Sequence, residues 1–355
     1  MRGKKADWRC AWLLGLAFLA ACTTSPFAGQ SAWTGLPPAA DAQASADPSA
    51  TPFRDWTLYP AIAVRPMPAD LWLLGDVHGD YRRLRDLLNG AGLADNPDTP
   101  EHVHWHAGTA TLVCTGDLID KGTDALDVIA YLQALSTQAA SAGGEVIVLL
   151  GNHEAEFLGD PTLSKVADFV TELANAGESA SEVAAGHQAP GAWLRQRPLA
   201  ARVGPWFMSH AGNSHGLTLA QLDAAIQNTL DSNGFYAAFF LADDSMLETK
   251  LANGGWWELA GQGPDDVLTK YAHALGAEHI VQGHQPQSIT FNDGTKRSAG
   301  SMAELYGRVF LIDVGMSGGV NDSNGALLHV RHDAAGEHAT VVPPSGDASL
   351  LWEGP

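Results

Sequence analysis

The sequence has few cysteines and few basic residues, and its N-terminal apolar run is short. Of three cysteines, Cys10 and Cys22 lie near the N-terminus, so Cys114 has no partner for a disulfide framework. Lys and Arg number 20 against 40 Asp and Glu. This acidic balance excludes non-specific nucleic-acid binding, because the phosphates would be repelled. The apolar run at 11–21 is too short to span a bilayer as a stop-transfer helix.

Residues 1–21 have the layout of a signal peptide, with basic residues ahead of an apolar run. The run ends Leu-Ala-Ala-Cys22, which resembles the lipobox of bacterial lipoproteins, in which the cysteine is lipidated. The alternative is an ordinary cleavage site beside an incidental cysteine. Residues 22–66 are rich in Pro, Ala and Ser, which predicts a linker. We therefore expect a lipid on Cys22 that tethers the protein to a membrane of the bacterial cell envelope, on the periplasmic face of the outer membrane.

Residues 67–345 are long enough for one large α/β domain, and residues 346–355 are expected to form a C-terminal tail. Apolar strands alternate with helical segments, as such a domain requires. Strands are expected at 71–74, 109–114, 145–150, 202–208, 279–282, 309–312, 326–330 and 339–342, and helical segments at 81–89, 124–136, 217–251 and 267–275. Residues 159–200 are expected to form a mostly helical insertion. One hypothesis is that this insertion is a lid over a crevice.

The stretch LWLLGDVHGD at 71–80 is an apolar strand that breaks on a glycine and then presents Asp76 and His78. Residues i and i+2 of an extended chain point to the same side, so a carboxylate and an imidazole can reach one cation together. The alternative is a turn whose Asp and His only cap the next helix. This motif alone does not decide between the two.

Four later strands end in the same way, on short glycine-containing loops that carry Asp, Asn or His. These loops read GDLIDKG at 116–122, GNHE at 151–154, SHAG at 209–212 and GHQP at 283–286. In an open α/β sheet the carboxyl ends of strands share one crevice. The ordered set of five loops therefore predicts a single site.

The five loops resemble the motifs of the calcineurin-like metallophosphoesterases, which are GDxHG, GDxxDxG, GNHE, a later His with a small residue and Gly, and GH. The forms at 116–122 and 151–154 are similar to the phosphoprotein phosphatase branch. The runs GAWLRQRP at 191–198 and IDVGMS at 312–317 are similar to the bacterial Shewanella-like phosphatases. The resemblance implies a β-sandwich flanked by helices, with the active site at the carboxyl ends of the strands.

The resemblance also implies two divalent metal ions. Their ligands would be Asp76, His78, Asp117, Asn152, His210 and His284, with Asp117 bridging both ions. Imidazole, carboxylate and amide oxygen together suit Mn, Fe or Zn, with Mn expected first. A hydroxide between the ions would attack phosphorus. His153 would act as general acid, held by Asp120, although a purely structural hydrogen bond between the two is the alternative.

The substrate is less well determined, because the second motif ends in Lys121 where the family usually has arginine. Phosphate binding is assigned to Lys121 and Asn152, and to Arg195, with Arg197 as an alternative and with surface or packing roles left open for both arginines. We expect hydrolysis of phosphate monoesters, including those of phosphoproteins. The alternatives are a dinucleoside polyphosphate or nucleotide hydrolase and a non-catalytic lipoprotein binding module.

Overall fold

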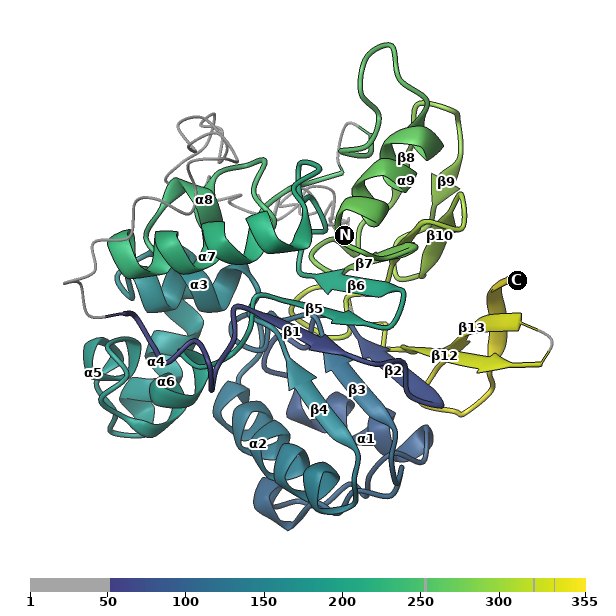
Figure 1. Cartoon of the computed structure of the whole chain (residues 1–355). Helices are drawn as coiled ribbons and strands as arrows, with labels where there is room; N and C mark the ends of the chain where they lie inside the picture. Colours follow the sequence, from purple (N-terminus) through teal and green to yellow (C-terminus); the bar gives the residue numbers. More distant parts are fainter. Residues whose placement is uncertain (1–51, 252–253, 322, 335) are drawn as a thin grey trace, which may run out of the picture.

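The computed structural model describes residues 52–251, 254–321, 323–334 and 336–355, so the predicted signal peptide and Cys22 lie outside the described residues. Two six-stranded sheets form the centre of the fold (Figure 1). The first contains, in spatial order, β1 (Ile62–Arg65), β5 (Ala200–Val203), β6 (Trp206–Ser209), β7 (His279–Gln282), β11 (Val309–Leu311) and β10 (Ala303–Leu305). The second contains β14 (Ser349–Gly354), β13 (Gly336–Val342), β12 (Leu327–Asp333), β2 (Asp70–Leu74), β3 (Thr111–Cys114) and β4 (Glu145–Val148). A separate hairpin pairs β8 (Ile289–Thr290) with β9 (Lys296–Arg297).

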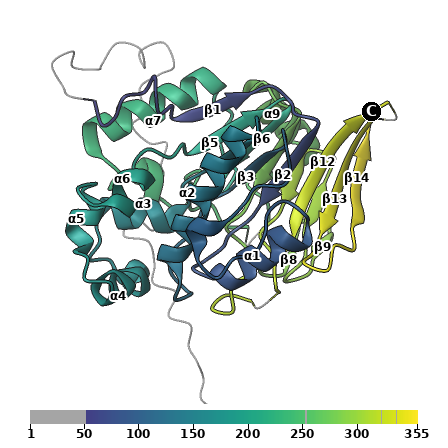
Figure 2. The same cartoon turned by 90° about the horizontal axis from the view of Figure 1, so that it is seen from below.

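Helices flank the sheets. They are α1 (Tyr81–Gly90), α2 (Ala125–Ser141), α3 (Asn152–Gly159), α4 (Ala167–Asn175), α5 (Ala180–Ala184), α6 (Ala189–Leu194), α7 (Leu219–Asn233), α8 (Ala238–Leu241) and α9 (Pro264–Ala274), with short 3₁₀ helices η1 (Pro100–His102) and η2 (Ser164–Val166). Both views place α4, α5 and α6 at the end of the molecule opposite β12 and β13 (Figures 1 and 2). No helix among the described residues is long and apolar enough to cross a membrane.

The alternation of side chains along β2 explains the layers. Leu71 and Leu73 join one buried cluster with side chains of the first sheet, such as Phe310. Trp72 and Leu74 point the other way and join the larger cluster beneath the helices. Because both faces of the strand are buried, its apolar run has no polar alternation. The predicted α/β sandwich flanked by helices is confirmed.

Strand direction determines where the loops gather. In the second sheet β2, β3 and β4 are mutually parallel, and in the first sheet β6, β7 and β11 are parallel. Parallel strands place their carboxyl ends at the same edge of a sheet. The loops that follow β2, β3, β4, β6 and β7 are the five that carry the sequence motifs.

Several boundaries differ from those that the sequence predicts. The expected linker, 22–66, contains strand β1, which pairs with β5. The single strand expected at 202–208 is a hairpin of β5 and β6, because Gly204 turns the chain with φ of 56°. The expected tail, 346–355, contains β14, which pairs with β13 at the edge of the second sheet (Figure 2). Residues 159–200 contain η2, α4, α5 and α6.

Candidate metal centre

The motif loops are held in unusual backbone conformations. His78, Asp117 and His284 have φ of 47°, 50° and 68°, and Asp120 and Lys121 have φ of 60° and 64°. Residues other than glycine rarely adopt this left-handed region, and such strain concentrates at functional sites. Backbone bonds hold the loops in place, since Val77 and His78 both donate their N–H groups to the Asp117 carbonyl, at 3.0 and 2.8 Å.

Two motif glycines leave room for carboxylates. A Cβ atom on Gly151 would collide with the side chain of Asp117, and one on Gly283 would collide with that of Asp76. Any larger residue at either position would displace the carboxylate that it faces. The glycines in GNHE and GHQP are therefore required by close approach between two loops.

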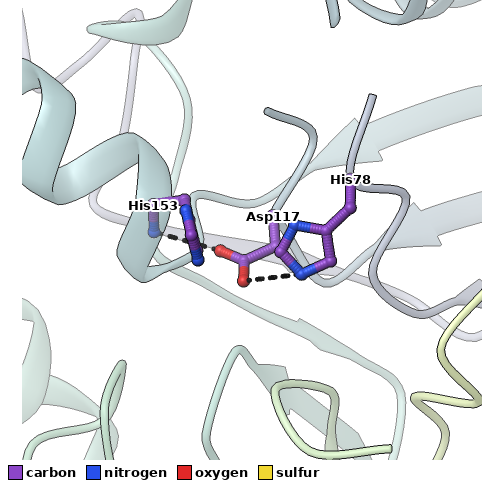
Figure 3. Close-up of side chains that lie close together, drawn as sticks. All are labelled: His78, Asp117 and His153. Carbon is purple, nitrogen blue, oxygen red and sulfur yellow. Dashed lines mark hydrogen bonds and ion pairs between the residues drawn. The ribbon is translucent and has the colours of Figure 1, made fainter. Parts of the chain in front are cut away.

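A first group of side chains consists of His78, Asp117 and His153, whose ligand atoms lie within 4.8 Å of one another (Figure 3). Asp117 Oδ2 is 3.4 Å from His78 Nε2, and Asp117 Oδ1 accepts a hydrogen bond from the His153 backbone N–H at 3.1 Å. His78 directs Nδ1 to the Ile119 carbonyl at 3.1 Å. That bond fixes the tautomer that leaves Nε2 with its lone pair toward Asp117, as in metal-binding histidines.

A second group consists of Asp117, His210 and His284, so Asp117 belongs to both groups. Asp117 Oδ2 is 3.4 Å from His210 Nε2, the same separation as from His78 Nε2. His210 Nε2 also lies 2.9 Å from Asn152 Oδ1 and 3.1 Å from His284 Nδ1. The structure therefore places Asp117 between the two sets of predicted ligands.

Asp76 completes the six predicted ligands. Its carboxylate lies 3.9 Å from His78 Nε2 and 4.0 Å from His210 Nδ1, and it accepts the His284 backbone N–H at 3.1 Å. Burial, together with repulsion by Asp313 and Asp117, raises the pKa of Asp76 well above its usual range. Burial also raises the pKa of Asp313 to about 6. A cation beside Asp76 would favour its ionised form.

The negative charge of Asp117 dominates the electrostatics of the candidate site. Burial opposes its ionisation, but attraction to His210, His153 and His78 outweighs burial and holds the pKa of Asp117 well below its usual range. Burial lowers the pKa of His78 to about 4 and that of His284 well below the usual value. These two imidazoles are therefore neutral at pH 7, which is the form that binds metals.

The donor set fits divalent metal ions. His210 Nδ1 faces the Thr115 carbonyl at 3.0 Å, so the proton there leaves Nε2 as an acceptor. In the neutral ring that nitrogen faces two other acceptors, the Asn152 amide oxygen and an Asp117 oxygen, and it lies 3.1 Å from His284 Nδ1. Acceptors that converge in a buried site require a positive charge between them. Nitrogen and oxygen ligands in this mixture suit Mn, Fe or Zn.

The predicted pair of His153 and Asp120 is present and buried. Asp120 Oδ2 lies 3.1 Å from His153 Nδ1, and Asp120 Oδ1 accepts the Phe169 backbone N–H at 2.9 Å. Burial lowers the pKa of His153, but Asp117 and the bond with Asp120 outweigh it, so the pKa is raised. The first residues of α4 therefore contact the same carboxylate that orients His153.

The predicted phosphate-binding side chains lie in different environments. Lys121 is exposed, and its backbone N–H donates to Asp168 at 3.3 Å. Arg195 donates to the Ala184 carbonyl at 3.1 Å and its guanidinium stacks 4.1 Å from the centre of the Phe53 ring. These contacts are packing contacts within the helical insertion and the N-terminal segment. They give the phosphate-binding role of Arg195 no support.

Several buried residues near the site carry no prediction from the sequence. Glu154, the last residue of GNHE, accepts backbone N–H groups of Gly151, Asp117, Leu118 and Ile119, at 2.7 to 3.1 Å. It therefore joins two motif loops, and its place in the motif is the signal that could have identified it.

Buried Arg297, from β9, donates to the carbonyls of Gln285 and Asp313. Partly buried Lys165 and buried Glu248 form an ion pair at 2.7 Å, and no motif marks either residue.

Comparisons with known proteins agree with this geometry. A family model described as calcineurin-like phosphoesterase matches residues 70–288, which is more than half of the chain and includes all five loops. An uncharacterized protein of Schizosaccharomyces pombe is 25% identical over 280 residues, 70% of this chain and 74% of its own length. Two other relatives match locally. Shewanella-like protein phosphatase 2 of Arabidopsis thaliana is 36% identical over 24% of this chain and 21% of its own length. A symmetrical bis(5'-nucleosyl)-tetraphosphatase of Proteus mirabilis is 34% identical over 36% of this chain and 38% of its own length.

Solved structures share the fold. A cold-active protein-tyrosine phosphatase of a psychrophilic Shewanella species superposes with a TM-score of 0.64 over 82% of both chains, at 21% identity. A protein serine/threonine phosphatase of Saccharomyces cerevisiae has a TM-score of 0.52, at 16% identity, over 78% of this chain and 79% of its own. With its family match, its sandwich and its converging loops, the chain belongs to the calcineurin-like phosphoesterases.

Proposed function

We propose that this metallophosphoesterase is a phosphatase that hydrolyses phosphate monoesters at a dinuclear centre, with phosphoproteins among its substrates. The observation that carries the proposal is the position of Asp117, whose Oδ2 is 3.4 Å from both His78 Nε2 and His210 Nε2. One carboxylate can thereby bridge two ions. Asp76 and His78 would hold one ion, and Asn152, His210 and His284 the other. We expect manganese, with iron or zinc as alternatives.

The two ions, when bound, would activate water and neutralise charge on the phosphoryl group. The chain's own residues would then supply the proton for the leaving oxygen. Asp120 holds Nδ1 of His153, so the proton to be donated is on Nε2, which points away from Asp120. Burial of His153 and Asp120 excludes water that would compete for this proton. Lys121 would attract the substrate phosphate as a point charge.

The overall likeness to the Shewanella protein-tyrosine phosphatase, which extends over 82% of both chains, supports a monoester substrate. The test is hydrolysis of a phosphotyrosyl peptide by the purified protein with added Mn²⁺ and with a chelator. We expect Mn-dependent phosphate release that the chelator abolishes. The variant Lys121→Ala should raise KM and leave bound metal unchanged. Absence of phosphate release from every monoester by protein that holds two metal ions would refute the proposal.

A second candidate function is hydrolysis of a dinucleoside polyphosphate. The local match to the Proteus mirabilis tetraphosphatase, at 34% identity over 131 residues, favours it. A direct comparison of kcat/KM for diadenosine tetraphosphate and for a phosphotyrosyl peptide separates the two functions. A preference of more than about tenfold for the diadenosine compound would replace the first proposal with the second.

We also propose that the folded domain is tethered to the outer membrane of a bacterial cell envelope, facing the periplasm, through a lipid on Cys22. The LAAC sequence at 19–22 supports this proposal. Mass spectrometry of the full-length protein from cell membranes should show a lipidated N-terminal peptide that begins at Cys22. The Cys22→Ala variant should leave the membrane fraction. Retention of that variant in the membrane would contradict a lipid anchor.

A further inference from the structure

Asn152 is an asymmetric ligand whose orientation must be fixed. Only its amide oxygen can bind a cation, because the other end of the amide carries two N–H donors. A rotation of 180° about the last side-chain bond would turn the donors toward the metal centre. In the structure Asn152 Oδ1 faces the centre, 2.9 Å from His210 Nε2, and Nδ2 faces away. Some group on the far side therefore selects this orientation.

Glu248 is that group. Asn152 Nδ2 donates to Glu248 Oε1 at 3.1 Å. An ionised carboxylate has only acceptor sites, so it can pair with the NH₂ end of the amide and not with the oxygen. Glu248 is 3% exposed, and its own position is fixed because its backbone N–H donates to the Ser245 hydroxyl at 3.0 Å.

Lys165 supplies a cationic partner for Glu248 in this buried place. Its ammonium lies 2.7 Å from Glu248 Oε1 and 2.8 Å from Glu156 Oε1. A buried carboxylate requires such a partner because burial of an unpaired charge is costly, and the Glu248 oxygen that faces Lys165 is the same one that accepts from Asn152. Lys165 belongs to η2 and so comes from the helical insertion, far in sequence from Glu248.

We propose that Lys165 and Glu248 are positioning residues that fix the Asn152 amide so that its oxygen faces the metal centre. This inference rests on the proposed role of Asn152 as a metal ligand. It gives the insertion at 159–200 a function other than that of a lid. The insertion reaches groups around the centre through Lys165, which pairs with Glu248, and through the Phe169 N–H, which donates to Asp120. Residues of the insertion thus support both the metal ligand and the pair that orients His153.

The experiment measures Mn²⁺ binding by calorimetry to the full metal-free chain, without reference to turnover. Glu248→Leu should weaken the Asn152-dependent site by ~10- to 100-fold, as loss of groups that orient a ligand usually does. The decisive comparison repeats this change in an Asn152→Asp background. A carboxylate has two equivalent oxygens and no donor, so it needs no orientation, and Glu248 repels it. In that background Glu248→Leu should tighten Mn²⁺ binding.

Matched controls separate this role from general damage. Lys165→Met should weaken Mn²⁺ binding by ~10-fold or more, and Lys165→Arg should restore it in part because the charge is kept. Lys270→Met removes an exposed lysine of α9, away from the motif loops, and it should leave binding unchanged. Thermal melts of each metal-free variant check folding. If Glu248→Leu does not fold, Glu248→Gln provides the same comparison with a smaller expected effect.

Each outcome decides the inference. Opposite effects of Glu248→Leu in the two backgrounds support it. Equal weakening in both backgrounds would overturn it, because that pattern shows only structural damage. If Asn152→Ala leaves Mn²⁺ binding unchanged, the ligand role of Asn152 itself is wrong. That result is distinct from failure of the Glu248 comparison alone.

Discussion

Replacement of His153 by asparagine tests the proposed proton transfer most directly. The variant removes the Nε2 proton and the 3.1 Å contact with Asp120, while the Asp117 contact with the residue 153 backbone N–H remains available. Proton donation by a positioned side chain contributes about 10²- to 10⁴-fold to rate. This corresponds to about 2.7 to 5.4 kcal/mol of transition-state stabilisation, at 1.36 kcal/mol for each factor of ten.

The assay compares two substrates with different leaving groups. An alkyl phosphate needs a proton on its leaving oxygen, whereas a nitrophenyl phosphate releases an anion that is stable without one. We expect His153→Asn to lower kcat for the alkyl phosphate by about 10²-fold or more, and by much less for the nitrophenyl phosphate. The number of bound metal ions, measured by elemental analysis, should not change.

A matched control uses the exposed pair of His104 and Asp95, which has a similar geometry at 2.8 Å. His104→Asn makes the same substitution away from the motif loops and should leave both rates unchanged. Equal loss of rate for both substrates would refute the role of His153 as proton donor. Loss of one metal ion would assign His153 instead as a ligand, in the group that it forms with His78 and Asp117.

The remaining predictions concern metal binding and stability. Asp117→Asn should abolish activity and weaken binding of both ions, since one side chain serves both groups; loss of only one ion would exclude a bridge. Mn²⁺ at 100 times its Kd should stabilise the metal-free protein by about 2.7 kcal/mol for each ion bound, seen as a rise in Tm, and an unchanged Tm would contradict coupling of the site to folding. Burial, with repulsion by Glu248, raises the pKa of Glu156 to about 7, so its folded form retains a proton that the unfolded chain loses near pH 4.5. Stability should therefore fall between pH 4.5 and 7. This fall should be smaller in Glu156→Gln. Curves of Tm against pH that run parallel for the variant and the unchanged protein would contradict the prediction.

The candidate metal centre could be predicted from the sequence because its residues directly follow strand ends. Each predicted ligand lies within a few residues of an apolar strand, and parallel strands must place their carboxyl ends together. Asp76, Asp117 and His284 could therefore be assigned to one site although they are far apart in the chain. The sandwich could be predicted for the same reason, since strands without polar alternation, such as β2, must be covered on both faces.

Other features depend on contacts between segments that no local pattern connects. The edge strand β14 was expected as a tail, because its pairing with β13 is decided by the partner strand and not by its own periodicity. Strand β1 lay in the expected linker for the same reason. Arg195 has the charge for phosphate binding, but packing against Phe53 and the Ala184 carbonyl determines its position.

Only the tertiary structure decided which residues orient the predicted ligands. Lys165, Glu248 and Asn152 are brought together by folding of the insertion against α3 and the turn after α8. A charged residue in a helical segment normally indicates a solvent-exposed face, so the sequence gives no sign that Lys165 is mostly buried. The sequence by itself determined which side chains meet at the metal centre, because strand ends converge. Only the packing of distant segments determined how those side chains are oriented, because orientation depends on partners that strand order does not specify.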